Sequence, residues 1–352
     1  MGVGGTAVRV WLTQPLRLFG LALLLSLTVA CAAQTGAPPA APTSSQAKST
    51  TLSKIRFGQT GASASQWNYY VAKSKNFFAN HGLDVEFITA NNAQTVYQQI
   101  LANATEVGVT GLPQGILAVD SGAKIKLVAG STTVPSYRVA VGKDIKGWAD
   151  LKGKTISLGG PNDVTYYYWK LLVEKQGLSL GDFNYVWAGA TSDRFAALKA
   201  NSVAGTLVLQ PFDFQAQAEG YPILGTLTDV LPPDQYIFTG AWVKTDWAVA
   251  NADTLVNLIQ AQNEATAWMT DPAHADEVKG ILQTYVPSTP DIIDKTYDLL
   301  IKGYAFFPKK AELPEPAMQN VIKSLVEVDA MKNEIPQSAF IDRQYIDRAN
   351  KS

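Results

Sequence analysis

Residues 154–177 read KTISLGGPNDVTYYYWKLLVEKQG, and this stretch decides the fold. Polar and apolar side chains alternate before two glycines, which is the pattern of a short strand that runs into a tight loop. The apolar and aromatic residues after Asp163 recur at helical spacing as far as Gly177, which is typical of a helix that ends at a glycine. The stretch therefore predicts a strand–loop–helix unit.

The same unit occurs about one hundred residues earlier in the chain. KIRFGQTG at 54–61 predicts a strand, and residues 65–82 predict a helix that Ser65 caps and Gly82 ends. In both copies a strand, a helix and a strand follow. In the first copy they are LDVEFIT, AQTVYQQILANA and VGVTG, and in the second they are LSLGDFNYVWAG, SDRFAALKANS and AGTLVLQP. Strands that alternate with helices predict a mostly parallel sheet in each copy.

The repeat predicts an α/β protein of two lobes, each a mostly parallel sheet flanked by helices. Two hinge crossings at 126–144 and 236–247 join the lobes, because both segments look like strands that pass from one copy to the other. We assign residues 54–139 to the first lobe, 140–240 to the second, and 241–352 to a return to the first lobe with C-terminal helices. Clefts at the carboxyl ends of such strands bind small ligands.

The single cysteine of the chain, Cys31, follows an apolar N-terminal segment. Arg9 and Arg17 precede LFGLALLLSLTVA at 18–30, and small residues end this run, as in a secretory signal peptide. TVAC at 28–31 resembles a bacterial lipobox, in which the cysteine is diacylated and becomes the new N-terminus.

Two segments therefore precede the predicted fold. Residues 1–30 are interpreted as a lipoprotein signal peptide. Residues 31–53 are rich in Ala, Pro, Ser and Thr and cannot bury enough apolar surface to fold, so we predict a disordered tether with lipid on Cys31. This places the protein on the outer face of the cytoplasmic membrane.

Composition excludes several other classes of protein. The chain has 29 Lys+Arg and 30 Asp+Glu, so it offers no basic field for nucleic acid. One cysteine and two distant histidines lack metal-ligand spacing, and we predict no metal and no cofactor. GWADLKGKT at 147–155 has five residues between its glycines where a phosphate-binding loop needs four. No nucleophile elbow is present, and we predict no catalytic residue.

Loops after the predicted strands supply candidate ligand-binding residues. Asn162 or Asp163 can cap the following helix, whose free N–H groups can also hold a polar or anionic ligand atom. TGLP at 110–113 ends the equivalent strand of the first copy, and QPFD at 210–213 that of the second. Gln210 can then hydrogen-bond a ligand and Asp213 can pair with a ligand amine. Ordinary capping and turn chemistry are the alternatives.

Aromatic residues in the first turns of two helices are further candidates. Aromatics at helical spacing are more often core residues, so we expect one or two of these rings to line the cleft, and Trp67 and Tyr166 are favoured because they lie nearest the loops.

Four segments together resemble one known family. They are YYVAKSKNFFANHGLDVEF (69–87), QILANATEVGVTGLPQGILAVDSGAKIKLVAG (99–130), WADLKGKTISLGGPNDVTYYYWKLLVEKQGL (148–178) and ALKANSVAGTLVLQPF (197–212). The chain is similar, over roughly residues 54–330, to substrate-binding proteins of the nitrate, sulfonate, taurine and bicarbonate ABC importers, whose relatives bind the pyrimidine precursor of thiamine.

The resemblance implies a type II periplasmic-binding-protein-like fold that closes on a small ligand and hands it to an ABC permease with a cytoplasmic ATPase. It implies an extracytoplasmic, monomeric protein that is not an enzyme. Its positions, together with those above, give these expected ligand contacts: Gly61, Ser63, Trp67, Thr110, Gly111, Ser131, Thr132, Gly160, Asn162, Asp163, Thr165, Tyr166, Gln210 and Asp213.

The predicted ligand is a small organic molecule, either sulfonate- or taurine-like or similar to the thiamine pyrimidine precursor. Asp163 would repel an anion, which argues against nitrate or a simple alkanesulfonate and favours a neutral, zwitterionic or aromatic molecule. Two other functions stay open: a module that presents its ligand to a partner receptor, and an enzyme like the fungal relatives that make the thiamine pyrimidine. The absence of cysteine after Cys31 argues against the enzyme, which uses a cysteine-rich iron site.

Overall fold

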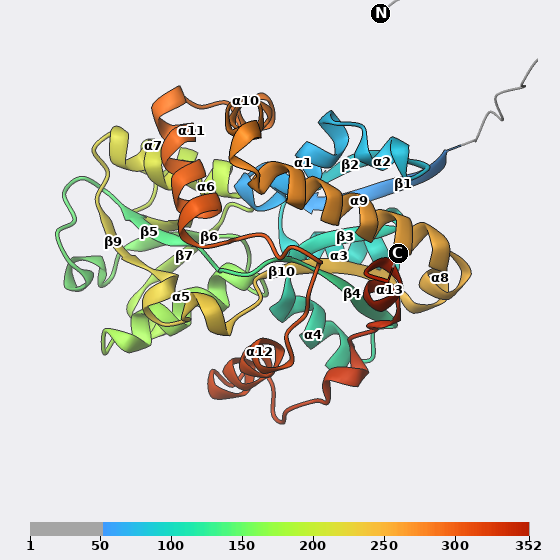
Figure 1. Ribbon diagram of the computed structural model, residues 1–352. Helices are drawn as coiled ribbons and strands as arrows, with labels where there is room; N and C mark the ends of the chain where they lie inside the picture. Colours follow the sequence, from blue (N-terminus) through green and yellow to red (C-terminus); the bar gives the residue numbers. More distant parts are fainter. Residues whose placement is uncertain (1–51, 352) are drawn as a thin grey trace, which may run out of the picture. The chain divides into compact units, whose positions relative to one another are not determined.

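The computed structural model describes residues 52–351 of the chain (Figure 1). The predicted signal peptide, Cys31 and nearly all of the predicted tether lie outside these residues, so the three predictions on them stay predictions. Between residues 52 and 351, no helix is both long and apolar enough to cross a membrane.

The described chain contains two five-stranded sheets with the same arrangement. The first sheet has the order β2 (Leu83–Ala90), β1 (Ser53–Thr60), β3 (Val107–Gly111), β10 (Thr239–Lys244) and β4 (Ile125–Thr132). The second has the order β7 (Asn184–Trp187), β6 (Thr155–Leu158), β8 (Gly205–Val208), β5 (Arg138–Val141) and β9 (Ile223–Thr226).

One strand of each sheet runs against the others. In the first sheet β1 is parallel to β2 and β3, whereas β10 is antiparallel to both β3 and β4. In the second, β6 is parallel to β7 and β8, whereas β5 is antiparallel to β8 and β9. The reversed strand is in each case the first strand after a crossing. The predicted two-lobed α/β fold is confirmed, and both sheets are mixed: four strands of each share one direction and the fifth is reversed.

The crossings differ in detail from the prediction. The segment 126–144 is not one strand, because β4 belongs to the first sheet and β5 to the second. Pro135 lies between these two strands and has no N–H to donate to a ladder. We call the first sheet with its helices the first lobe, and the second sheet with its helices the second lobe. The chain enters the second sheet at Arg138 and re-enters the first at Thr239. The exact domain limits stay predictions.

The helices lie along and between the two sheets (Figure 1). They are α1 (Trp67–Ser74), α2 (Phe77–Asn80), α3 (Ala93–Leu101), α4 (Leu112–Asp120), α5 (Val164–Lys175), α6 (Thr191–Lys199), α7 (Phe212–Ala218), α8 (Thr245–Ala250), α9 (Ala252–Thr270), α10 (Ala275–Tyr285), α11 (Pro290–Tyr297), α12 (Glu315–Glu327) and α13 (Gln344–Ala349).

The helix predicted over 65–82 is two helices, α1 and α2. Asn76 separates them with φ of 61°, a left-handed conformation that asparagine tolerates better than most residues. The Ser65 side chain caps neither helix. Instead, the Ser63 hydroxyl accepts a hydrogen bond from the N–H of Ser65 at 3.3 Å.

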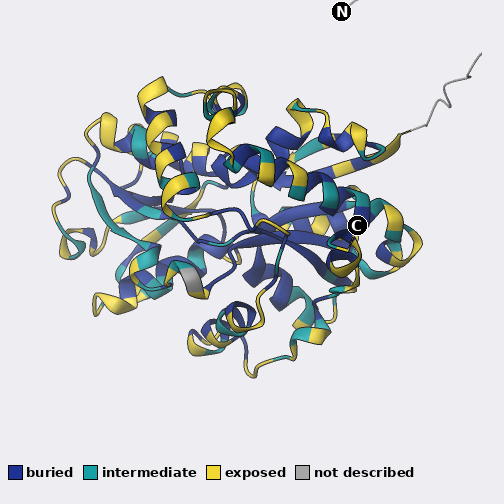
Figure 2. Cartoon of the chain, in the orientation of Figure 1, coloured by how far each residue is buried: buried dark blue, intermediate teal, exposed yellow. Residues whose placement is uncertain are grey.

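Apolar strands and the inner faces of the helices form the core. Figure 2 shows the central strands of both sheets as mostly buried and the outer faces of the helices as exposed, whereas the edge strands β7 and β9 of the second sheet are exposed or half-buried. Beyond the two strand crossings, α11 of the C-terminal region packs against α7 of the second lobe, and α12 packs against α4 of the first. The C-terminal helices thus contact both lobes.

Candidate functional site

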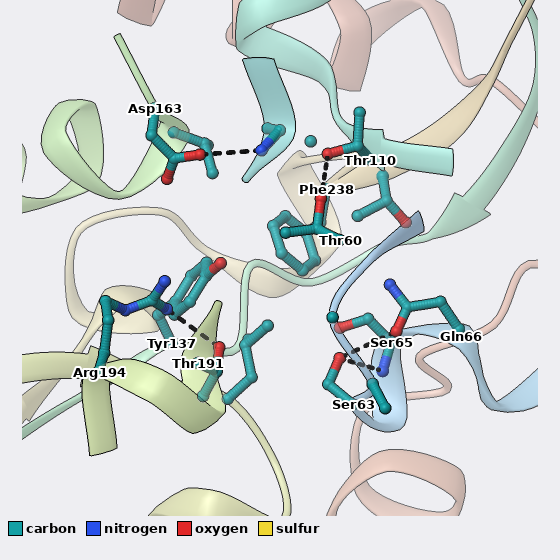
Figure 3. A pocket seen from close by; sticks show the side chains of 17 residues that line it. Thr60, Ser63, Ser65, Gln66, Thr110, Tyr137, Asp163, Thr191, Arg194 and Phe238 are labelled. Atoms are coloured by element: carbon teal, nitrogen blue, oxygen red, sulfur yellow. Dashed lines mark hydrogen bonds between the residues drawn. The ribbon is translucent and has the colours of Figure 1, made fainter. Parts of the chain in front are cut away.

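A small cavity lies between the two lobes (Figure 3). Its volume is about 40 Å³, enough for a few water-sized groups. The first lobe lines it with Thr60, Gly61, Ala62, Ser63, Ser65, Gln66, Ala93, Thr110, Gly111, Phe238 and Thr239. Tyr137 lies at the crossing, and the second lobe contributes Asp163, Val164, Thr191, Arg194 and Leu209. Because both lobes supply its walls, the cavity exists only while the lobes are together.

Hydroxyl groups dominate the wall from the first lobe. The hydroxyls of Thr60 and Thr110, at the ends of β1 and β3, lie 3.2 Å apart. In the turn after β1, Ser63 donates a hydrogen bond to Oε1 of Gln66 at 3.0 Å. These groups can each give or receive a hydrogen bond, so this wall is suited to a polar ligand.

Glycine at position 61 allows the lobes to approach closely. Its φ of 50° is left-handed, and a Cβ there would lie 2.9 Å from the Cβ of Ala190 in the second lobe. A larger residue would strain the turn and push the lobes apart. Gly189, with φ of 75°, faces the Asn91 carbonyl of the first lobe in the same way.

Arg194 places a buried cation at the cavity wall. Only 2% of this residue is exposed. Its guanidinium donates to the carbonyls of Gly189 and Leu207 and, at 3.0 Å, to the hydroxyl of Thr191. These acceptors are all neutral, and within residues 52–351 no carboxylate forms an ion pair with Arg194. Burying a charge without a counter-charge is costly, so this guanidinium is suited to an anionic ligand group.

Tyr137 packs beside this cation. The guanidinium carbon of Arg194 lies 5.9 Å from the centre of the Tyr137 ring. Burial raises the pKa of Tyr137 to about 12, although the charge of Arg194 opposes the rise. The phenol therefore stays neutral at physiological pH and can act as a hydrogen-bond donor at the cavity.

The carboxylate of Asp163 is occupied by protein donors. Oδ1 accepts from the N–H of Thr165 at 3.0 Å and from its hydroxyl at 2.7 Å, so Asp163 is the residue that caps α5. Oδ2 accepts from the N–H of Ala93 at 3.1 Å. Since Ala93 begins α3, the negative charge lies against the positive ends of two helices. These donors oppose the predicted repulsion between Asp163 and an anionic ligand.

The structure brings part of the predicted site to the cavity. Gly61, Ser63, Thr110, Gly111 and Asp163 line it. Their role in ligand binding stays a prediction.

Six other predicted residues lie just behind or beside it. Thr132 hydrogen-bonds the cavity residue Thr239 at 2.7 Å, and Thr165 holds Asp163. Ser131 is fully buried, with no hydrogen-bond partner for its hydroxyl in the described chain. Gly160 lies close to Asn92 of the first lobe. Asn162 and Tyr166 line a wider outer groove of about 700 Å³.

The side chains of Gln210 and Asp213 do not line the cavity and form a buried network of their own. The amide of Gln210 donates to Oδ2 of Asp213 at 3.0 Å and accepts from the Ser136 hydroxyl at 2.7 Å. Arg138 forms an ion pair with Asp213 at 3.2 Å. Burial raises the pKa of Asp213, and Arg138 opposes this rise. The network therefore supports the crossing strand β5 from behind.

Trp67 also lies away from the cavity. It is fully buried, and its indole N–H donates to the carbonyl of Val278 in α10 at 3.0 Å. Its ring meets Tyr297 edge-on, with the ring centres 6.2 Å apart. This geometry is that of a core residue.

Arg194 is the most distinctive residue of the cavity, and it is not among the site residues predicted from the sequence. The buried residues of α6 are Thr191, Arg194, Phe195 and Leu198, which recur at the spacing of a core-facing stripe. An arginine within such a stripe was the available signal, because arginine is almost never fully buried unless it is paired.

The fold and the cavity define a two-lobed α/β protein with a small polar cavity between its lobes. The family described as "NMT1/THI5 like" matches residues 64–275, and the chain belongs to this family.

Known proteins share the sequence or the fold. A protein of Bacillus subtilis named as a binding protein, YtlA, is 22% identical over 266 residues, which cover 73% of this chain and 78% of YtlA. The periplasmic nitrate-binding protein NrtA from Synechocystis superposes with a TM-score of 0.69 at 15% identity, over 85% of this chain and 89% of NrtA. The periplasmic aliphatic sulphonate-binding protein SsuA from Escherichia coli gives 0.63 at 15% identity, over 82% and 92%. The structural similarity establishes the periplasmic-binding-protein fold predicted from the sequence.

Proposed function

We propose that this protein is the extracytoplasmic solute-binding component of an ABC importer and has no catalytic role. One observation carries the proposal: the cavity takes its walls from both lobes, so a ligand inside it bridges them. A bridged ligand favours the closed state by its differential affinity for closed over open lobes. The structural similarity to SsuA and NrtA supports this function.

The ligand we propose is a small molecule with one acidic group. Arg194 supplies a buried charge for that group, and the hydroxyls of Thr60, Ser63 and Thr110 face it from the first lobe. A cavity of about 40 Å³ favours few heavy atoms. Of the two predicted ligand types, a sulfonate- or taurine-like molecule therefore suits the cavity better than the thiamine pyrimidine precursor, which carries no acid.

The test is a thermal-shift panel on the purified chain without its signal peptide. The panel contains taurine, methanesulfonate, nitrate, bicarbonate, small aromatic acids and the thiamine pyrimidine precursor. We expect at least one small acid to raise the melting temperature, because a ligand at one hundred times its Kd stabilises the folded state by about 2.7 kcal/mol. Native mass spectrometry then verifies one ligand per chain. A rise with the pyrimidine alone would contradict the proposed ligand, and no rise with any compound would contradict the proposed function.

The proposed partners are an ABC permease with its ATPase and, through lipid on Cys31, the membrane, with the protein itself a monomer. Replacing Cys31 with alanine is expected to move the protein from the membrane fraction to the soluble fraction, because only the cysteine thiol accepts the diacylglycerol. Fractionation and immunoblotting measure this, with Ser44→Ala in the tether as the matched control. Continued membrane attachment of the Cys31→Ala variant would contradict the anchor.

A further inference from the structure

Two hydrogen bonds join the lobes directly beside the cavity. Oδ2 of Asp163 in the second lobe accepts from the N–H of Ala93 in the first at 3.1 Å. The carbonyl of Gln210 accepts from the N–H of Ala64 at 3.0 Å. Only the first of these uses a side chain, so sequence can tune it by substitution.

The bond from Asp163 is a strong one for its type. Asp163 is 5% exposed, and its acceptor is a carboxylate, which binds N–H groups more tightly than a neutral oxygen. The donor is the first N–H of α3, which has no partner inside its own helix. Asn92 already caps α3 by accepting from the N–H of Thr95 at 2.9 Å, and this leaves the N–H of Ala93 for Asp163.

Asp163 lines the buried cavity and also the outer groove. The groove runs between α3 and α4 of the first lobe and α5 of the second, with residues 328–330 at one side. The Asp163–Ala93 bond therefore lies in the wall that separates the cavity from the groove. The bond joins the N-terminal ends of α3 and α5 at this wall, while Lys170 of α5 donates to the Val328 carbonyl at 2.6 Å farther along the groove.

We propose that Asp163 is a latch: its carboxylate holds the lobes together without a ligand and separates the buried cavity from the outer groove. The proposal rests on the hinged closure of the proposed function but not on which ligand binds. It also assigns Asp163 a role different from the ligand contact predicted from the sequence. Because the apparent Kd of a closed-state ligand scales inversely with the closed fraction, loss of the latch weakens ligand binding as well.

The substitution Asp163→Ser separates the latch from the helix cap. Serine is a good N-cap, so it can still accept from the N–H of Thr165 and preserve α5. Its side chain is one bond shorter and uncharged, and it does not span the gap to Ala93. Asp193→Ser is the matched control, because Asp193 is an exposed acid in the first turn of α6.

The experiment measures the distance between the lobes with spin labels. Exposed Gln98 in α3 and exposed Gln176 after α5 are replaced with cysteine in a Cys31→Ala background, which contains no other cysteine. Pulsed electron–electron double resonance then records the distances between the two spin labels without ligand. We expect one narrow distribution of label-to-label distances for the chain with Asp163 intact and for the Asp193→Ser control. For Asp163→Ser we expect a longer-distance population, with the open-to-closed ratio raised about tenfold or more.

Two outcomes would overturn the latch. One is the same distribution for Asp163→Ser as for the unsubstituted chain, whether or not the melting temperature falls. The other is a broad distribution in the unsubstituted chain, since the lobes would then open freely despite Asp163. Circular dichroism verifies that each variant is folded. The thermal-shift panel tests the proposed function independently, so a failed latch with a bound ligand is distinguishable from a failed binding function.

Discussion

Replacing Arg194 with glutamine is expected to weaken binding of the acidic ligand by about 100-fold or more. The guanidinium is buried at the cavity and pairs with no carboxylate of the described chain. Removing one partner of a buried charge pair costs about 3–5 kcal/mol, and each 1.4 kcal/mol is a factor of ten in Kd. Isothermal titration calorimetry with the acid that gives the largest thermal shift in the panel measures the loss.

Three controls separate recognition of the acid from damage to the fold. Arg194→Lys retains the charge without the planar fork and should bind more weakly than Arg194 but better than Arg194→Gln. Arg56→Gln removes a cation that pairs with Glu106 away from the cavity and whose side chain is 45% exposed. The ligand affinity of this variant should stay unchanged. Thermal melts without ligand report any loss of packing. An unaltered Kd in a folded Arg194→Gln variant would mean that the ligand does not contact this residue.

Replacing Trp67 with alanine is expected to lower the free energy of unfolding by about 3–5 kcal/mol. The indole is fully buried in contact with Tyr297, and its N–H donates to the Val278 carbonyl, so the substitution removes this packing and one buried hydrogen bond. Urea denaturation followed by circular dichroism measures the change. Ligand affinity of the folded fraction should change little, because Trp67 does not line the cavity.

The matched control for Trp67 is Trp187. This residue lies on the edge strand β7 and is 45% exposed. Trp187→Ala should cost less than Trp67→Ala, because the Trp187 ring is half exposed and its ring contacts are with Tyr185 and Tyr166 on one side. A Trp67→Ala variant that keeps its stability and loses its ligand would instead support the prediction that Trp67 lines the cleft.

Period and repetition were enough to predict the fold. Each strand of the second copy has a counterpart in the first, and both sheets have the same strand order. The crossing at 126–144 was placed correctly but was predicted as one strand. Pro135 stands in the sequence and was the available signal for this break, because proline has no N–H to donate to a strand ladder.

The site was harder to predict, because a strand end defines a loop but not the direction of its side chains. Gln210 follows β8 as predicted, yet its amide turns back toward Ser136 and Asp213. Trp67 opens α1 as predicted, yet its ring faces α10. Arg194 was missed since its position in the stripe of α6 resembles a core position. The position of Arg194 at the cavity depends on Tyr137 and on the first lobe, and only the tertiary structure brings these groups together.

The position of the reversed strand β10 in the first sheet affects the order in which the two sheets can form during synthesis. All strands of the second lobe, β5 to β9, are consecutive in the chain between Arg138 and Thr226. The first lobe needs β10, which lies between β3 and β4 but is synthesised after the whole second lobe. As the polypeptide grows from its N-terminus, the second lobe can complete its sheet first. β3 and β4 cannot pair with β10 until the second lobe has been synthesised. The second lobe is thus an insertion within the first. Its sheet can be completed during synthesis before the sheet of the first lobe, although its strands begin later in the chain.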